Sequence, residues 1–157
     1  MAQLISIFNP ATLLKAVLSI FFALLLMLQF LSFPGQFRYM SEEEPENGHL
    51  RWPLTALSFL VILAVEIIVI SVWKIVDALE KEKGRSIELK FVNYAIAALL
   101  FIWAVIAIGL VLLLLTADDP GLPVVITVIE TAVTAVALLF LFYRRLLKRA
   151  LNRASNH

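Results

Sequence analysis

The chain has 157 residues, of which 62% are hydrophobic and 16% charged, with a formal net charge of +1 and no cysteine. Soluble domains have about 45–50% apolar and about 25% charged residues, and a soluble chain of this size could not bury so much apolar surface. The composition therefore indicates an integral membrane protein. The absence of cysteine excludes a disulfide framework and thiolate chemistry.

Four apolar runs fill most of the chain, at residues 12–33, 54–73, 94–116 and 124–143. A transmembrane helix needs about 20 mainly apolar residues at 1.5 Å rise each, and every run meets that length. A β-barrel would alternate apolar and polar residues in shorter strands, whereas residues 110–115 are continuously apolar. We expect an all-α integral membrane protein, an up-down bundle of four transmembrane helices forming a single domain over residues 1–157.

The basic residues predict the orientation of this bundle, because Lys and Arg collect on the cytoplasmic side of a membrane. Of the thirteen Lys and Arg residues, one lies at the start of the first run, five in segment 74–93 and five in the tail 144–157. The predicted outer loops, 34–53 and 117–123, hold the other two. Both termini are therefore expected in the cytoplasm. We expect the first run to be a retained span and not a cleaved signal peptide, because no small-x-small cleavage site follows it.

Helix ends are marked along the chain. Asn9-Pro10 places a capping side chain before a proline at the first helical position. Pro34-Gly35 is expected to stop the first helix. Trp52 and Trp73 are 21 positions apart, or about 31 Å along a helix, close to the hydrocarbon thickness of a bilayer. Both indoles are then expected at headgroup depth.

Further markers concern the later helices. Asp77 and Lys81 are four residues apart and can pair on one helix face, which predicts that the second helix continues past the bilayer. Gly84 is expected to end that helix and Ser86 to cap the next. Residues 118–121 form a tight turn that makes the third and fourth helices antiparallel neighbours. Gly109 offers a small surface for close helix packing.

Two acids lie inside apolar runs, Glu66 in the second and Glu130 in the fourth. Charge at bilayer depth costs a few kcal/mol on insertion scales, so such residues usually face the bundle interior. Each acid has polar neighbours on its own helical face. The candidate intramembrane polar site consists of Glu66, Glu130, Thr127, Thr131, Thr134 and Ser58.

Two interpretations of this site are open. In one, Glu66 and Glu130 form a protonatable or cation-coordinating pair. In the other, which we favour, the polar groups hold helices together through hydrogen bonds. For straight, centred helices the two acids differ in depth by about 9 Å, which argues against direct pairing. With no basic residue in mid-span, we expect both carboxyls to be protonated at neutral pH unless water reaches them.

The tail carries a second candidate site. At 100° per residue its basic residues cover one half of the helical wheel and its leucines the other, which is typical of an amphipathic helix on an anionic inner leaflet. The alternative is a docking surface for an acidic cytoplasmic protein. Direct contact with nucleic acid is not expected beside lipid. The residues expected to contact lipid headgroups or a partner are Arg144, Arg145, Lys148, Arg149 and Arg153.

The sequence offers little for metal or catalytic chemistry. The acidic run 42–46 and His49 lack a recognised ligand spacing, so a solvated loop is favoured over a divalent cation site. No nucleophile elbow, phosphate loop or His-rich motif is present. We expect no catalytic residue, no metal, no cofactor and no enzymatic activity.

A family resemblance covers nearly the whole chain. Leu50-Arg51-Trp52-Pro53-Leu54 opens the second run, Trp73-Lys74 closes it, and Gly84-Arg85 precedes Phe91-Val92-Asn93. With four spans, this layout resembles the bacterial membrane family known as domain of unknown function 2975. Members usually have an apolar Ile-Phe-like pair after the glycine, where this chain has Ser86-Ile87-Glu88. The family has no established activity, so the resemblance implies no catalytic residue. It implies a small cytoplasmic regulator as a partner, since some members look to be encoded beside a helix-turn-helix protein.

We therefore expect a bacterial inner-membrane protein that acts without catalysis, as a regulatory or scaffolding four-helix bundle. The alternative is a small proton- or cation-linked carrier or channel-like protein that uses Glu66 and Glu130. Four spans are few for a monomeric transporter, so the carrier interpretation favours a homo-oligomer.

Overall fold

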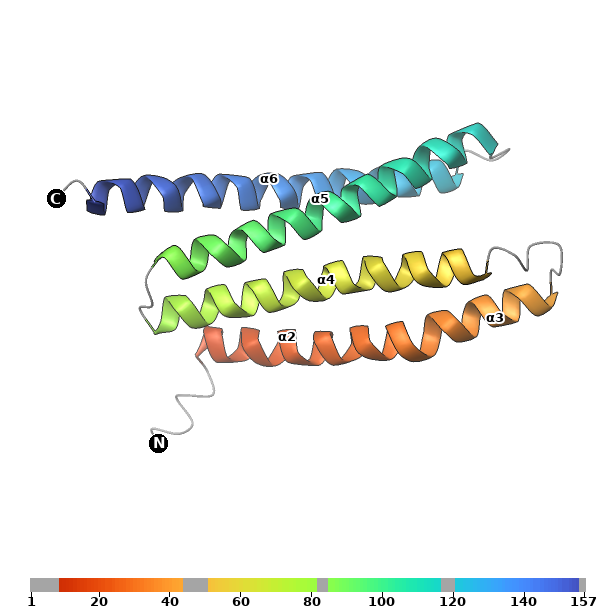
Figure 1. Cartoon of the computed structure of the whole chain (residues 1–157), viewed down its shortest axis with the longest axis horizontal. Coiled ribbons are helices and arrows are strands. Elements are labelled where there is room, and N and C mark those ends of the chain that lie inside the picture. Colours follow the sequence, from red (N-terminus) through yellow and green to blue (C-terminus); the bar gives the residue numbers. More distant parts are fainter. Residues whose placement is uncertain (1–8, 44–50, 82–84, 117–120, 156–157) are drawn as a thin grey trace. The chain divides into compact units, whose positions relative to one another are not determined.

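A computed structural model describes residues 9–43, 51–81, 85–116 and 121–155. Within these ranges the chain is helical apart from single residues at helix ends, and no strand occurs there. The elements are α2 (Pro10–Met27), the π-helical segment η1 (Leu28–Ser32), α3 (Phe33–Glu43), α4 (Arg51–Glu80), α5 (Arg85–Thr116) and α6 (Gly121–Ser155), shown in chain order in Figure 1.

Four stretches of these helices are long and apolar enough to span a membrane. They are Pro10–Tyr39, Thr55–Glu80, Glu88–Val111 and Pro123–Arg153. The predicted class, an all-helical chain with four apolar helices of spanning length, is confirmed. The helices are longer than the apolar runs suggest. With 35 residues, α6 measures about 52 Å, well beyond a hydrocarbon core of about 30 Å.

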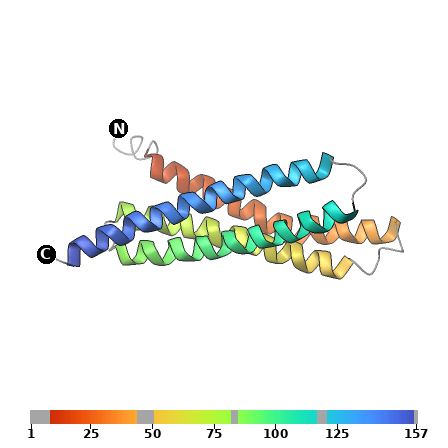
Figure 2. The same ribbon diagram turned by 90° about the horizontal axis from the view of Figure 1, so that it is seen from above.

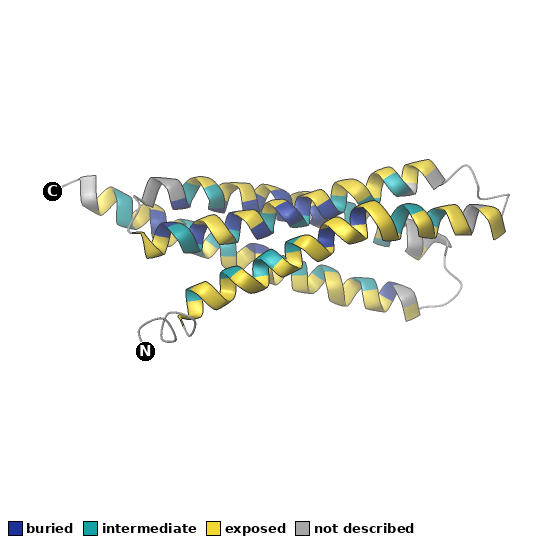
Figure 3. Ribbon diagram, turned by 90° about the horizontal axis from the view of Figure 1, so that it is seen from below, coloured by how far each residue is buried: buried dark blue, intermediate teal, exposed yellow. Residues whose placement is uncertain are grey.

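The chain divides into two compact units, Met1–Val69 and Ile70–His157. In the first unit, α2 begins as the sequence predicts. Asn9 precedes the helix, its side-chain oxygen accepts a hydrogen bond from the amide of Ala11 at 3.1 Å, and Pro10 occupies the first turn. The cap satisfies one amide that has no partner inside the helix. Most of α2 is exposed, as the yellow ribbon near the N-terminus shows (Figure 3).

The core of the first unit is a small apolar cluster. Leu25 of α2 and Ile62 and Val69 of α4 are buried in it. Partly buried side chains pack against these three: Leu18, Phe22, Phe33 and Val65. Phe30 and Phe59 add an edge-on ring contact with 5.8 Å between centroids. The two helices therefore meet through aliphatic and aromatic side chains.

The predicted helix stop at Pro34-Gly35 is wrong. The chain widens into η1 over Leu28–Ser32, and α3 then continues to Glu43. At the end of η1 the amide of Phe33 donates to the carbonyl of Leu28, five residues earlier. Proline inside an α-helix lacks an amide and its ring clashes with the carbonyl four residues earlier. A π turn just before Pro34 changes that carbonyl's position, so the helix continues past the proline.

The second unit is built on α5 and α6, which run antiparallel and pack together (Figure 2), as predicted from the tight turn. The turn residues 117–120 themselves lie outside the described residues. The core cluster of the second unit buries Ile75, Val92, Ile96 and Leu147, and Val92 is completely inaccessible to solvent. Partly buried side chains surround it: Leu89, Phe91, Phe140, Leu141 and Tyr143.

The small residues of α5 that are buried are not the one that the sequence predicts to pack closely. Ala95 and Ala98 are buried, at 0% and 6% exposure. Gly109, the predicted close-packing residue, is exposed, and a Cβ added there would meet no described atom within 4 Å. No described helix therefore packs closely against Gly109.

The predictions at the end of α4 are partly confirmed. Lys81 pairs with Asp77 at 2.8 Å, one helical turn apart, and α4 continues past Trp73 to Glu80. Helix α5 begins at Arg85, so Ser86 lies inside the helix and is not its cap. Gly84 lies outside the described residues.

Candidate functional site

Glu66 is a buried acid in the middle of α4. Its side chain is 5% exposed, and its Oε1 atom has no hydrogen-bond partner among the described residues. Ile62, one turn earlier on the same face, is also buried, whereas Thr55 and Ser58 are half-buried. On this face of α4, which the sequence predicts to turn inward, the residues nearest Glu66 are therefore the most buried.

Glu130 lies near the start of α6 and is half-buried. Both of its carboxyl oxygens are buried, and neither has a hydrogen-bond partner among the described residues. Of its polar neighbours, Thr127 and Thr131 are exposed and Thr134 is half-buried. Glu130 belongs to the second unit and Glu66 to the first. The predicted difference in depth, which argues against direct pairing of the two acids, stays a prediction.

The threonines of α6 donate to their own helix. Thr127 donates to the carbonyl of Pro123, Thr131 to that of Thr127 and Thr134 to that of Glu130, each at 2.8 Å. Threonine commonly forms this bond to the carbonyl four residues earlier. The hydroxyl hydrogens of the stripe are therefore satisfied without a ligand or a second helix.

One bond from the stripe crosses between helices. Trp103 of α5 donates its indole N–H to the Thr134 hydroxyl oxygen at 3.1 Å. The sequence places Trp103 in mid-span, where an indole seeks an acceptor because the bilayer offers none. In the sequence, the only hint of this bond is that Thr134 lies on a polar helix face, where an indole could find an acceptor. This contact links α5 to α6.

Gln29 was missed by the sequence analysis. It is 4% exposed within η1, and its Nε2 atom donates to the backbone carbonyl of Phe59 in α4 at 3.3 Å. A glutamine in the middle of an apolar run is itself a signal, because its amide needs a partner inside the membrane. Its acceptor is a backbone atom, which no side-chain pattern can reveal.

A second missed contact joins Glu88 and Tyr143. Glu88 lies in the first turn of α5 and is 5% exposed, and the hydroxyl of Tyr143 in α6 donates to its Oε2 at 3.3 Å. A carboxylate near a helix N-terminus is favoured by the helix dipole. The bond fixes the start of α5 against α6 at the point where the basic residues begin.

The basic tail is the last part of one continuous helix. Four of its cations are exposed: Arg145, Lys148, Arg149 and Arg153. Arg144 is half-buried, and its Nε atom has no hydrogen-bond partner among the described residues. On the apolar side Leu147 is buried in the core of the second unit, whereas Leu146 is 45% exposed. Part of the apolar side therefore packs on protein.

The acidic run 42–46 begins in the last residues of α3 and is only partly described. Arg38 pairs with Glu42 at 2.9 Å, and the Tyr39 hydroxyl donates to Glu43, each one turn apart on the helix. Glu44, Glu46 and His49 lie outside the described residues. Where the structure is described, no three His, Cys, Asp or Glu side chains gather to hold a metal ion.

These observations define a class: a helical chain with four helices long and apolar enough to span a membrane and a basic C-terminal extension. Within its apolar helices, buried carboxyl oxygens of Glu66 and Glu130 have no hydrogen-bond partner among the described residues. The chain belongs to the family described as protein of unknown function DUF2975, whose profile matches residues 35–156. The resemblance inferred from the sequence is thereby confirmed. The match takes in most of α3 and all of α4, α5 and α6. No curated protein and no solved structure matches the chain.

Proposed function

We propose that this protein is a non-enzymatic regulatory or scaffolding protein of the bacterial cytoplasmic (inner) membrane, with both termini in the cytoplasm. The observation that carries this proposal is the continuity of α6. A single helix of 35 residues begins in an apolar stretch and ends in exposed cations. Such an extension presents a rigid basic face beyond the lipid, suited to the acidic surface of a cytoplasmic partner.

The polar groups inside the helices support the same proposal. Gln29 and Trp103 bond from one helix to another, and the α6 threonines bond within their own helix. These are the bonds that hold helices together or satisfy hydroxyls in a bilayer. The cavity between α4 and α6 is lined by apolar and aromatic side chains and includes neither Glu66 nor Glu130.

Orientation is tested with single cysteines, since the natural chain has none. Glu46→Cys and Asn152→Cys would each be treated with a membrane-impermeant maleimide on intact cells stripped of their outer membrane. We expect labelling of the first at once and of the second only after permeabilisation. The reverse pattern would place the basic tail outside and overturn the proposal.

The scaffolding role is tested by a photo-crosslinking residue placed at Arg149 in cells. Val128, 64% exposed near the other end of the same helix, is the matched control because it should face lipid. We expect adducts with a soluble cytoplasmic protein from position 149 and none from position 128. Charge reversal by Arg145→Glu should abolish the adduct. Adducts with lipid alone at position 149 would contradict a protein partner.

A carrier or channel-like function is the second candidate. It is favoured by one observation, the buried and unpartnered carboxyl oxygens of Glu66 and Glu130. Unpaired acids inside membrane helices often belong to ion or proton pathways. A carrier reconstituted in liposomes should show pH-dependent flux that Glu66→Gln or Glu130→Gln abolishes. The scaffold should show no flux above empty liposomes, with or without either substitution.

A further inference from the structure

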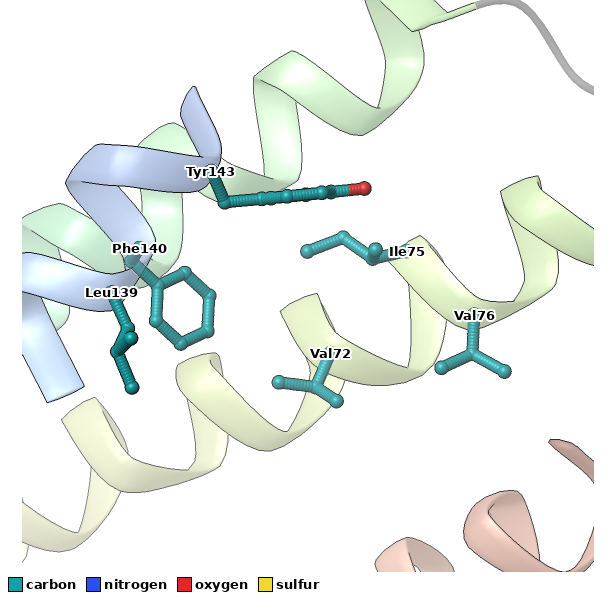
Figure 4. Close-up of a pocket in the computed structure, with 6 residues that line it drawn as sticks. All are labelled: Val72, Ile75, Val76, Leu139, Phe140 and Tyr143. Carbon is teal, nitrogen blue, oxygen red and sulfur yellow. The ribbon is translucent and has the colours of Figure 1, made fainter. Parts of the chain in front are cut away.

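A groove lies between α4 and α6 in the second unit. It has a volume of about 270 Å³ and is lined by Val72, Ile75, Val76, Leu139, Phe140 and Tyr143 (Figure 4). Ile75 is buried and forms its floor, whereas Leu139 is 66% exposed at its rim. Figure 4 shows the Phe140 ring turned toward Val72 and the Tyr143 ring lying beside Ile75. All six side chains offer apolar surface to the space.

The depth of the groove is indicated by its neighbours. Trp73, 41% exposed, lies between two lining residues of α4, and tryptophan gathers at the boundary between hydrocarbon and headgroups. On the other wall the basic residues of α6 begin directly after Tyr143. The groove therefore lies where acyl chains meet headgroups. It is the end of α4 and α6 that the distribution of Lys and Arg assigns to the cytoplasm.

Arg144 is the first cation of α6 after the groove residues Phe140 and Tyr143. Arg144 follows Phe140 by four residues, so the two side chains share a helix face one turn apart. Its Nε atom is buried and has no hydrogen-bond partner among the described residues. Tyr143 does not supply a second free polar group, because its hydroxyl already donates to Glu88 at 3.3 Å. The groove thus has apolar walls, and one turn beyond Phe140 the same helix carries a cation whose Nε atom has no hydrogen-bond partner among the described residues.

We propose that this groove binds one acyl chain of an anionic phospholipid, whose phosphate is held by the guanidinium of Arg144. An acyl chain matches the apolar lining, and a phosphate matches the cation by charge and by its oxygen acceptors. Basic pockets between membrane helices on the cytoplasmic side bind such headgroups. The exposed cations further along α6 add attraction to the same leaflet. The proposal goes beyond the proposed function, since a scaffold and a carrier are equally able to hold this lipid.

The test measures lipid affinity of the intact chain in mild detergent by native mass spectrometry. Phosphatidylglycerol and diacylglycerol with identical acyl chains, the second lacking a phosphate, are titrated separately. We expect one phosphatidylglycerol to bind with about tenfold preference, because a hydrogen bond to a charged group is worth that factor or more. Arg144→Gln should remove the preference and leave diacylglycerol binding unchanged. Lys90→Gln, which removes one charge from an exposed position of α5 that does not line the groove, should keep the preference.

The acyl site is tested separately. Val72→Phe fills the groove and should weaken both lipids about tenfold, the effect of losing contact with two methylene groups or so. Val128→Phe makes the same change on an exposed position of α6 far from the groove and should leave both affinities unaltered. Thermal unfolding in the same detergent checks that each variant is folded. Arg144→Lys, which keeps the charge, keeps the proposal testable if Arg144→Gln does not fold, and should retain part of the preference.

Three results would overturn the proposal. Equal losses from Arg144→Gln and Lys90→Gln would mean diffuse attraction by the basic residues of the chain. Unchanged lipid binding in Val72→Phe would mean that the groove holds no acyl chain. A lipid-free dimer that Val72→Phe dissociates would mean that a second copy of the chain fills the groove.

Discussion

The two units differ in how polar groups inside apolar helices are satisfied. In the first unit Gln29 donates to a backbone carbonyl of another helix, beside a π turn. In the second unit the threonines of α6 donate to carbonyls of their own helix, and the Trp103–Thr134 and Tyr143–Glu88 bonds join α5 to α6. The length of the side chain explains the difference, since a glutamine reaches a neighbouring helix and a threonine does not.

This difference indicates which contacts stabilise each unit. Lipid tails are as apolar as leucine, so helices in a bilayer associate through packing and hydrogen bonds and not through exclusion of water. The second unit relies on packing around Val92, which is completely buried. The first unit has a smaller apolar cluster and adds a hydrogen bond from buried Gln29 to a backbone carbonyl of α4. Substitutions of each kind should therefore weaken different units.

The largest expected effect is in the core of the second unit. Ile96→Ala should lower the free energy of unfolding by about 2 kcal/mol, because it leaves a cavity beside Val92 while lipid competes for the lost contacts. Ile108→Ala, on the same helix but 62% exposed, should change it by less than about 0.5 kcal/mol. Unfolding in mixed micelles measures both. Equal losses would mean that the described core does not hold this unit together.

Next in size is the hydrogen bond of the first unit. Gln29→Leu should cost about 1 kcal/mol, since it removes the donor to the Phe59 carbonyl. Gln36→Leu, the same substitution at an exposed position of α3, is its control and should cost nothing measurable. Infrared spectra should show the carbonyl of an isotope-labelled Phe59 shifted only in the Gln29 variant. If the carbonyl band stays in place, the bond is absent in the membrane.

The interhelical contact of the second unit should matter less. Thr134→Val removes the acceptor of the Trp103 indole and should cost about 0.6 kcal/mol, the average for such bonds between membrane helices. Thr131→Val removes only a bond within α6 and should be close to neutral. Tryptophan fluorescence should report the freed indole in the first variant alone. Identical effects of the two variants would mean that the Trp103–Thr134 bond adds nothing to stability.

The smallest effect concerns the exposed end of α4. Lys81→Met breaks the pair with Asp77, in which the lysine side chain is 58% exposed. A helix pair of this spacing contributes about 0.3 kcal/mol, and salt screens it. The loss should therefore disappear in high salt, as unfolding at two ionic strengths would show. A loss that persists in high salt would mean that the lysine stem, and not its charge, is what matters.

The sequence predicts the helices of this fold well because bilayer-length apolar runs leave few alternatives. The helical cap at Asn9, the Asp77–Lys81 pair and the packing of α5 on α6 follow from spacing alone, and the structure confirms them. The predicted stop at Pro34 fails because proline excludes the regular α-helical hydrogen bond and not a helix that first widens into a π turn. The sequence carries no local signature of that widening.

The candidate site was only partly predictable. Glu66 and Glu130 are conspicuous in the sequence because acids are rare in apolar runs, and both have buried oxygens. The partners of Gln29, Trp103 and Glu88 depend on which helices pack together, so periodicity does not reveal them. Gly109 was misassigned because a glycine permits close approach without requiring it.

The uninterrupted length of α6 has a mechanical consequence. From residue 124 to residue 155 the helix contains no glycine or proline, the usual causes of a kink. It therefore acts as a stiff lever. A tilt of roughly 5° about its first turn displaces the far end of a rod of about 52 Å by about 4–5 Å. A force on one end of α6, from lateral bilayer tension or from a bound protein, would therefore move the other end by more than the width of a water molecule.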